Sequence, residues 1–189
     1  MTIIVAARTK TGVCIAADSQ ATRGWEKLQN EGSKLWVAGQ YAIGAAGDLR
    51  TAQVIKHFTT WPKYRPVEDT DVEAFCVKSL TPAIRTAGEG AGVVRCLHGV
   101  TNMDAEFLMA WGTTIAGISS NGCVIVPTHD RHAIGSGYAE ALGYLGTKGP
   151  WTVEQVCEAA NRATISARGC AGPIDHITTE GLALVRGEA

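Results

Sequence analysis

Residues 2–22 read TIIVAARTKTGVCIAADSQAT, and this stretch decides which kind of fold the chain forms. Two short runs of small and β-branched apolar residues, 2–8 and 13–17, flank the sequence TKTG at 9–12. Apolar runs of this length that are joined by a glycine-containing turn are typical of a β-hairpin. The sequence therefore predicts that the chain opens with a buried antiparallel hairpin.

Strand and helix patterns alternate along the rest of the chain. The pattern predicts strands at 34–39, 41–47, 105–111, 113–119, 123–127, 132–137, 174–178 and 181–185. Helical spacing of apolar residues runs from Asp48 to near Trp61, from 69–70 to the glycines after 87, over 138–145 and over 153–166. Asp48 and Thr152 are predicted N-caps, and Pro82 is expected to kink or end the second helix.

This order of elements indicates an α+β fold. Strands, two helices, strands, two helices and strands, in one domain of residues 1–189, can form two antiparallel sheets that pack face to face. Helix pairs would then cover the outer faces. We therefore predict a four-layer αββα sandwich.

Composition and charge exclude several classes of function. Seventeen basic and eighteen acidic residues leave a net charge of −1, and no cluster of Lys or Arg stands out, so no nucleic-acid or membrane-surface partner is expected. No apolar run reaches the length of a membrane span, and the first residues lack a basic leader with a cleavage site. We expect no export signal and a cytoplasmic location.

Cysteine and histidine spacing does not indicate a metal site. The six cysteines lie far apart and form no CxxC pair, so we expect them to be small buried apolar residues. His129 and His132 are expected to lie in a surface loop, because no further ligands are spaced to complete a zinc site. The sequence predicts no metal and no cofactor.

Thr2 is the first residue that points to chemistry. Cytosolic aminopeptidase removes an initiator Met readily when the next side chain is small, and removal of Met1 would give Thr2 a free α-amine beside its hydroxyl. An α-amine titrates near neutral pH, so it can take the hydroxyl proton and activate the oxygen as a nucleophile. A threonine at this position can equally be an ordinary N-terminal residue.

The sequences AADSQAT at 16–22 and GSKLW at 32–36 resemble the motifs of proteasome β subunits and of the bacterial peptidase HslV. In that family an Asp follows the nucleophile by sixteen residues and a Lys follows by sixteen more, and Thr2, Asp18 and Lys34 have these intervals. The resemblance implies that the Lys34 ammonium lowers the pKa of the Thr2 hydroxyl and α-amine, while Asp18 keeps Lys34 charged and oriented.

The resemblance extends to the groups that would complete the site. Gly47 resembles the family glycine whose backbone N–H forms the oxyanion hole, and Gly44 is an alternative because the interval that follows Lys34 is one residue shorter than in proteasomes. Ser136, in AIGSG, is similar to a family serine that relays the proton of the terminal amine. Ser136 can also serve as the N-cap of the following helix.

Substrate contacts and one departure from the family pattern follow from the same resemblance. Thr22 and Ala46 would lie along a substrate strand, with Ala21 shaping a side-chain pocket. Near the end of the chain, SARGCAGPID places Ala167 and Cys170 where proteasome β subunits have an Asp and a Ser. HslV also lacks that Asp, so its loss does not require inactivity.

The resemblance implies a threonine-type peptidase in which Thr2 attacks a peptide carbonyl and forms an acyl-enzyme. It also implies a homo-oligomeric ring, hexameric or heptameric and possibly stacked, that receives polypeptide from an ATP-dependent unfoldase. Two alternatives stay open. One is a non-catalytic ring or scaffold protein of the same fold, and the other is an amidohydrolase of the same chemistry that acts on a small amide.

Overall fold

Two five-stranded antiparallel sheets form the centre of the molecule, in a computed structural model that describes residues 1–23, 26–29, 32–97, 100–166 and 170–187. The first sheet has the order β12-β1-β2-β13-β14, with bounds Arg131–Ile134, Ile4–Arg8, Val13–Asp18, Ile174–Thr178 and Leu184–Val185. The second has the order β11-β10-β9-β6-β5, with bounds Val124–Ile125, Thr114–Ile118, Ala105–Trp111, Tyr41–Gly47 and Leu35–Ala38. The predicted α+β class with antiparallel sheets is confirmed.

The two predicted hairpins at the start of the chain belong to different sheets. β1 pairs with β2 in the first sheet, and β5 pairs with β6 in the second. The later block of strands is divided in the same way, because β9 to β11 join the second sheet while β12 pairs with β1. The chain therefore crosses between the sheets, which brings residues from both halves of the sequence to one end of the gap between them.

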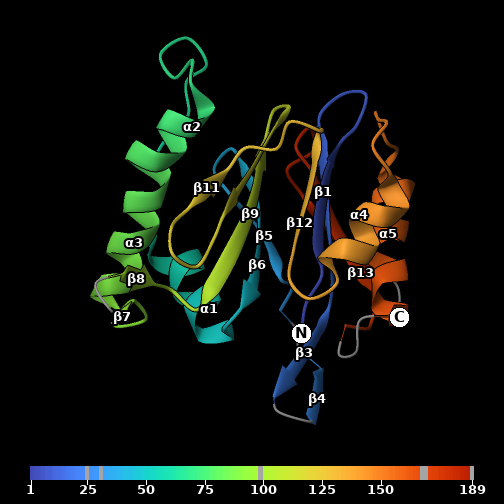
Figure 1. Cartoon of the computed structure of the whole chain (residues 1–189), viewed down its shortest axis with the longest axis horizontal. Coiled ribbons are helices and arrows are strands. Elements are labelled where there is room, and N and C mark those ends of the chain that lie inside the picture. Colours follow the sequence, from blue (N-terminus) through green and yellow to red (C-terminus); the bar gives the residue numbers. More distant parts are fainter. Residues whose placement is uncertain (24–25, 30–31, 98–99, 167–169, 188–189) are drawn as a thin grey trace.

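Apolar side chains fill three layers, and the two-residue period of the strands assigns each side chain to one of them. In β9, Phe107 and Met109 belong to the cluster packed against α1 and α3, whereas Leu108 faces the first sheet. In β1, Ile4 faces the second sheet and Val5 belongs to the cluster under α4 and α5. Figure 1 shows α1 to α3 outside one sheet and α4 and α5 outside the other.

The helices begin where their capping residues place them. Their bounds are α1 Leu49–Phe58, α2 Val72–Phe75, η1 Cys76–Leu80, α3 Thr81–Gly90, α4 Tyr138–Leu145 and α5 Val153–Ser166. The Asp48 carboxylate accepts a 2.8 Å hydrogen bond from the Thr51 backbone N–H. Before α5, Gln155 and Thr152 exchange hydrogen bonds between side chain and backbone, at 2.9 and 3.3 Å, which is a capping box. Both predicted N-caps are confirmed.

Pro82 was predicted to kink or end the second helix. It does not end the helix, because helical structure continues to Gly90. A π-helical turn, η1, immediately precedes the proline. Its last hydrogen bond joins the Thr81 N–H to the Cys76 carbonyl five residues earlier. This wider turn accommodates a ring that would otherwise press on the carbonyl four residues back, so the helix persists.

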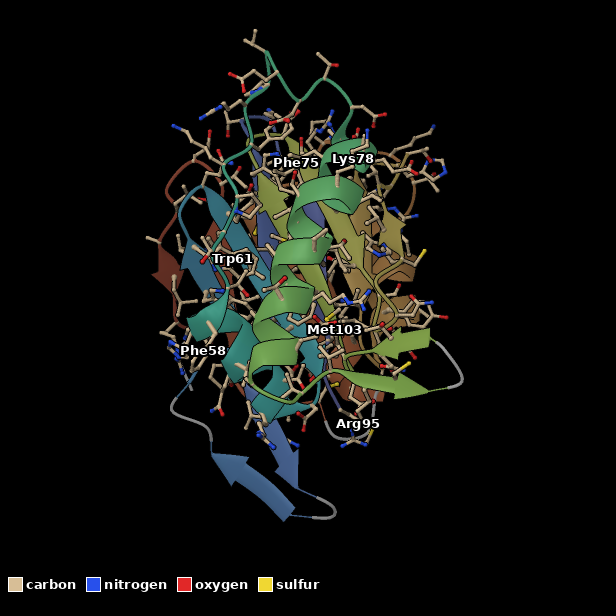
Figure 2. All side chains as sticks on the ribbon, turned by 90° about the vertical axis from the view of Figure 1, so that its left-hand side faces the viewer. Phe58, Trp61, Phe75, Lys78, Arg95 and Met103 are labelled. Atoms are coloured by element: carbon tan, nitrogen blue, oxygen red, sulfur yellow. The ribbon has the colours of Figure 1, made fainter. Side chains whose placement is uncertain are left out.

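Two small hairpins have no counterpart among the predicted strands. β3 Gln20–Arg23 pairs with β4 Glu26–Gln29, and β7 Arg95–Leu97 pairs with β8 Val100–Asn102. The β3–β4 hairpin projects beyond the sheets on the side of the N-terminus, and Figure 2 shows the β7–β8 hairpin beside the lower end of α3. Their sequences are short and lack an alternation of apolar and polar residues, which is why the pattern did not indicate them.

Candidate active site

Asp18 and Lys34 meet at the end of the gap between the sheets where the chain begins. The Lys34 Nζ lies 2.7 Å from the Asp18 Oδ1, and the side chains are 10% and 0% exposed. Asp18 ends the buried strand β2, and Lys34 directly precedes β5 of the other sheet. The ion pair therefore joins the two sheets. The structure brings together the two charged residues that the sequence intervals selected.

The Asp18 carboxylate also holds two backbone groups. Its Oδ1 accepts from the Ile3 N–H at 2.9 Å, and its Oδ2 accepts from the Ala171 N–H at 3.3 Å. With the bond from Lys34, this fully buried carboxylate receives one charged and two neutral donors. These bonds offset the free-energy cost of removing the charge from water. Asp18 thus positions the residue after Thr2, the ammonium of Lys34 and the loop before β13.

Thr2 lies beside this pair, with its backbone in contact with the loop before α4. The Thr2 N–H lies 3.4 Å from the Ser136 Oγ, and the Thr2 carbonyl accepts from the Ser136 hydroxyl at 3.4 Å and from the Gly137 N–H at 3.5 Å. Thr2 is 9% exposed. In this structure Met1 is attached, and the Lys34 Nζ donates to the Met1 carbonyl at 3.4 Å. The nitrogen of Thr2 is therefore an amide here.

Ser136 does not cap α4. The N-cap position of that helix is Gly137, which offers no side-chain hydrogen bond. The hydroxyl of Ser136 is directed to the Thr2 backbone instead. The capping alternative for Ser136 is therefore wrong, and the contact with Thr2 over a separation of 134 residues is the observed one.

A cavity of about 400 Å³ opens at this end of the gap. Its walls come from both sheets and from the loops that follow β8, β10 and β12. The residues that matter below are Thr2, Ala46, Gly47, Asp104, Glu106 and Ser136. The candidate nucleophile and the candidate proton-relay serine thus share one cavity.

The two glycines considered for the oxyanion hole have different surroundings. Gly47 lines the cavity at the end of β6, with a φ of +117° that favours glycine. Gly44 lies in the middle of β6, and a Cβ there would approach the side chains of Ile4 and Leu35 to 2.8 Å. Gly44 therefore allows the two sheets to pack closely. The assignment of the oxyanion N–H to Gly47 stays a prediction, and its position in the cavity favours it.

The three residues predicted to contact substrate lie in two strands. Ala46 is on the face of β6 that looks toward the first sheet, and it lines the cavity. Ala21 and Thr22 lie in β3, in the part of the chain whose side chains the structure does not describe. Among the described strands, β3 pairs only with β4, so its second edge can accept an extended peptide. The substrate roles stay predictions.

Cys170 lies against Ser136, where the family resemblance places a serine. Its Sγ is 3.7 Å from the Ser136 Oγ, and the residue is 3% exposed. Burial raises the pKa of the Cys170 thiol, so it stays protonated at neutral pH and can act as a weak donor to Ser136. Ala167, the other departure from the family pattern, lies outside the described residues.

The prediction that all six cysteines are buried is confirmed for Cys14, Cys76 and Cys170, but Cys157 is half-buried, and the prediction is wrong for Cys96 and Cys123, which are exposed. We expect iodoacetamide to modify these two in the native protein and to leave Cys170 and Cys76 unmodified until the chain unfolds. Burial raises the pKa of Cys76 to about 12, so its thiolate stays scarce even in mildly alkaline buffer. Peptide mass spectrometry after timed alkylation measures this order. Native modification of Cys170 as fast as Cys123 would contradict its burial.

Three residues of the site were not identified from the sequence. Glu106 and Asp104 line the cavity, and Gly135 lies directly against the Thr2 carbonyl with a φ of +84°. Gly135 stands beside Ser136 in the AIGSG segment, so that motif contained a signal for it. His132 lies in strand β12 and is half-buried, which agrees with the predicted strand 132–137 and not with the expectation of a surface loop.

Neither a group of potential metal ligands nor a membrane-spanning helix is present in the part of the chain that the structure describes. No group of three His, Cys, Asp or Glu side chains there is arranged to hold a metal ion. None of the helices described combines the length and the apolar character that crossing a membrane requires.

Comparisons with known proteins identify the fold. A scan against protein-family models finds no match, and a search of curated proteins finds none. Among solved structures, BPH from Thiobacillus denitrificans, in complex with epoxomicin, has a TM-score of 0.73 at 16% identity, over 99% of this chain and 100% of that one. Eukaryotic HslV from Trypanosoma brucei has a TM-score of 0.63 at 20% identity, over 93% of this chain and 98% of that one.

A third structure, the helical assembly of the Anbu complex from Pseudomonas aeruginosa, has a TM-score of 0.64 at 16% identity. It covers 93% of this chain and 80% of that one. At these identities the likeness concerns the fold alone. The resemblance to HslV that the two sequence motifs indicated is confirmed at that level.

Proposed function

We propose that this chain, which has the fold of HslV, BPH and Anbu, is an N-terminal-nucleophile hydrolase of four-layer αββα architecture whose nucleophile is Thr2. The observation that carries the proposal is the convergence of Thr2, Asp18, Lys34 and Ser136 at one end of the gap between the sheets. A charge pair in which both side chains are at least nine-tenths buried is costly to maintain for structure alone. Its place beside a threonine that lines a cavity supports a catalytic role.

Removal of Met1 is the activating step in this proposal. It converts the Thr2 nitrogen from an amide, which cannot act as a base, into an amine. It also removes the Met1 carbonyl that accepts from the Lys34 ammonium at 3.4 Å. One donor of Lys34 is then released toward Thr2, while the 2.7 Å bond to Asp18 holds the ammonium in place. Lys34 and the new amine carry like charges, which favours the neutral amine that a general base requires.

The reaction proceeds through a threonine ester. The Thr2 hydroxyl oxygen attacks the amide carbonyl carbon, and its proton moves to the Thr2 amine, with Ser136 beside that nitrogen as the relay. The negative oxygen is stabilised by the Gly47 N–H. The C–N bond then breaks as the proton passes to the leaving amine. Water attacks the ester carbon, returns a proton to the Thr2 oxygen and releases the carboxylic acid.

A polypeptide is the proposed substrate, and an oligomer is the proposed form. Among the described strands β3 pairs only with β4, and its other edge, beyond the bond from the Gln20 N–H to the Ala171 carbonyl, suits an extended peptide that runs past Ala21 and Thr22 toward Ala46. Three apolar side chains on α4 and α5 are exposed in the single chain, namely Tyr138, Tyr144 and Ile165. Exposed apolar side chains on neighbouring helices support association of identical chains. The proposed assembly is a ring in the cytoplasm, served by an ATP-dependent unfoldase. The solved Anbu complex forms a helical assembly.

The proposal predicts one covalent adduct per chain with epoxomicin, the compound found in the BPH structure. Intact mass spectrometry of the purified protein should show loss of the Met1 mass and the gain of one inhibitor. The Thr2→Ala variant, which keeps the amine and loses the hydroxyl, should gain none. Met1 retained in a fully folded protein, or a processed chain that takes no inhibitor, would contradict the proposal and favour a non-catalytic ring protein.

A further inference from the structure

Glu106 is an acidic side chain at a position that otherwise faces the apolar gap between the sheets. In the register of β6 and β9 it lies opposite Ala46. Leu108 and Ala110, two and four residues further along β9, point toward the first sheet, whereas Ala105 and Phe107 face the helices. The period of the strand therefore directs Glu106 into the gap, on the side of Thr2. Both residues line the same cavity.

The carboxylate of Glu106 has no counter-ion among the residues that the structure describes. Among the described residues it forms no hydrogen bond or ion pair, and no Lys or Arg side chain lines the cavity. Asp104, the other acid of the cavity, is 3.6 Å from Arg95 and 43% exposed, so its charge is partly compensated and well hydrated. The Lys34 ammonium forms its ion pair with Asp18. The cavity is thus acidic, and the uncompensated charge is that of Glu106.

His132 is the titratable group across the gap from Glu106, and it does not neutralise the carboxylate. It lies on the same face of β12 as Ile134, next to Gly117 of β10, where a Cβ would come within 2.8 Å of the His132 Nε2. Burial lowers the pKa of His132, and the opposing effect of Glu106 is smaller. The imidazole is therefore neutral near pH 7. A cation from the substrate would meet a free carboxylate.

We infer that Glu106 makes this cavity select substrates with a lysine or arginine side chain next to the scissile amide. The inference rests on the proposed function, since it concerns what the same cavity accepts. A carboxylate partly removed from water gains most from a charged donor that enters with the substrate. Lys and Arg carry their charge at the end of a long apolar stem, so the charge can reach β9 while the amide stays at Thr2.

The test compares peptides that differ in one residue, placed on either side of the scissile bond as lysine, norleucine or glutamate. With protein that has lost Met1, kcat/KM for the better lysine peptide should exceed that of its norleucine partner by about 10- to 100-fold, the range of a charge-assisted hydrogen bond. Glu106→Gln should reduce this ratio to about 1, and Glu106→Lys should favour the glutamate peptide. Glu73→Gln, an exposed change on α2 at the far end of the molecule, should leave the ratio unchanged.

Binding separates this inference from the proposed function. The anisotropy of fluorescent peptides added to Thr2→Ala protein reports the cavity without turnover. Weaker binding of the lysine peptide in Thr2→Ala/Glu106→Gln than in Thr2→Ala supports the inference, even if epoxomicin fails to label Thr2. Equal binding of the lysine and norleucine peptides to Thr2→Ala would overturn the inference, even if Thr2 is labelled. So would a preference for the lysine peptide that is unchanged by Glu106→Gln, provided that the melting temperature is also unchanged.

Discussion

The Asp18→Asn variant is expected to lose amide hydrolysis by roughly 10³- to 10⁴-fold, the size of loss seen when an orienting carboxylate is replaced in a catalytic triad. Asp18 is fully buried and receives three hydrogen bonds, one of them from the Lys34 ammonium at 2.7 Å. Asparagine has nearly the same shape, but it carries no charge and one of its two terminal atoms is a donor. At least one of the three donors then loses its acceptor, and Lys34 is left without a counter-ion.

The same change should destabilise the fold. Breaking a buried ion pair by removing one partner costs about 3–5 kcal/mol. In a chain of this length each kcal/mol lowers Tm by roughly 2–4 °C, so we expect a decrease of about 10 °C. Thermal unfolding followed by circular dichroism measures it, together with kcat/KM on a peptide substrate.

A second buried aspartate provides the matched control for Asp18. The Asp175 side chain is 0% exposed and lies 3.2 Å from the Arg186 guanidinium, on the strand that pairs with β2. Asp175→Asn should change stability and leave kcat/KM within about two-fold, because surface or structural sites outside the catalytic unit contribute little to turnover. Full activity in Asp18→Asn, or equal losses of activity in both variants, would remove Asp18 from the proposed mechanism.

Gly135→Ala is expected to have a large effect for the addition of a single methyl group. A Cβ at Gly135 would overlap the Thr2 carbonyl oxygen and come within 2.9 Å of its carbon. Both atoms belong to the backbone, so no side chain can rotate away. The φ of +84° adds about 1–2 kcal/mol for a residue with a Cβ. We expect a total loss of roughly 2–4 kcal/mol, since backbone strain and overpacking act together.

Activity should decrease further than stability in this variant. The Thr2 backbone has to move away from Gly135 and Ser136, and a displacement of about 1 Å in a catalytic group can cost about 100-fold in rate. Gly39→Ala is the matched control, because Gly39 has a φ of +59° and a Cβ there would meet nothing within 4 Å. Gly39→Ala should lose only the stability that corresponds to the positive φ, and it should keep full activity. If the two variants behave alike, Thr2 is not held against Gly135 as the structure has it.

In the proposed mechanism, an attached Met1 and an active centre exclude each other. With Met1 present, the Thr2 nitrogen is an amide and the Lys34 ammonium is shared between Asp18 and the Met1 carbonyl. The surrounding contacts with Ser136, Gly137 and the Asp18 carboxylate involve the backbone of Thr2 and Ile3 and do not need Met1. In the proposed mechanism, the backbone around Thr2 is therefore already in place before the base exists.

Local patterns in the sequence were sufficient for most of the secondary structure. The apolar runs before and after TKTG formed β1 and β2, and Asp48 and Thr152 capped the helices that were expected there. Hydrophobic period and capping chemistry act over a few residues, so they can be read without knowing what covers each face. The same reasoning failed at Pro82, because the π-turn that accommodates the ring depends on packing.

By itself, the sequence determined the intervals from Thr2 to Asp18 and from Asp18 to Lys34. These residues meet because Thr2 lies just before β1, Asp18 ends β2 and Lys34 directly precedes β5, and all three strands are short and regular. Only the tertiary structure decided that the two hairpins lie in opposite sheets, that Ser136 reaches Thr2, and that Glu106 points into their cavity. An acid on a strand and a serine before a helix have no local pattern that names their partners. The contact of Ser136 with Thr2 joins residues 134 positions apart in the chain, and Glu106 pairs with Ala46 of another strand, so both are set by how two sheets and their loops pack.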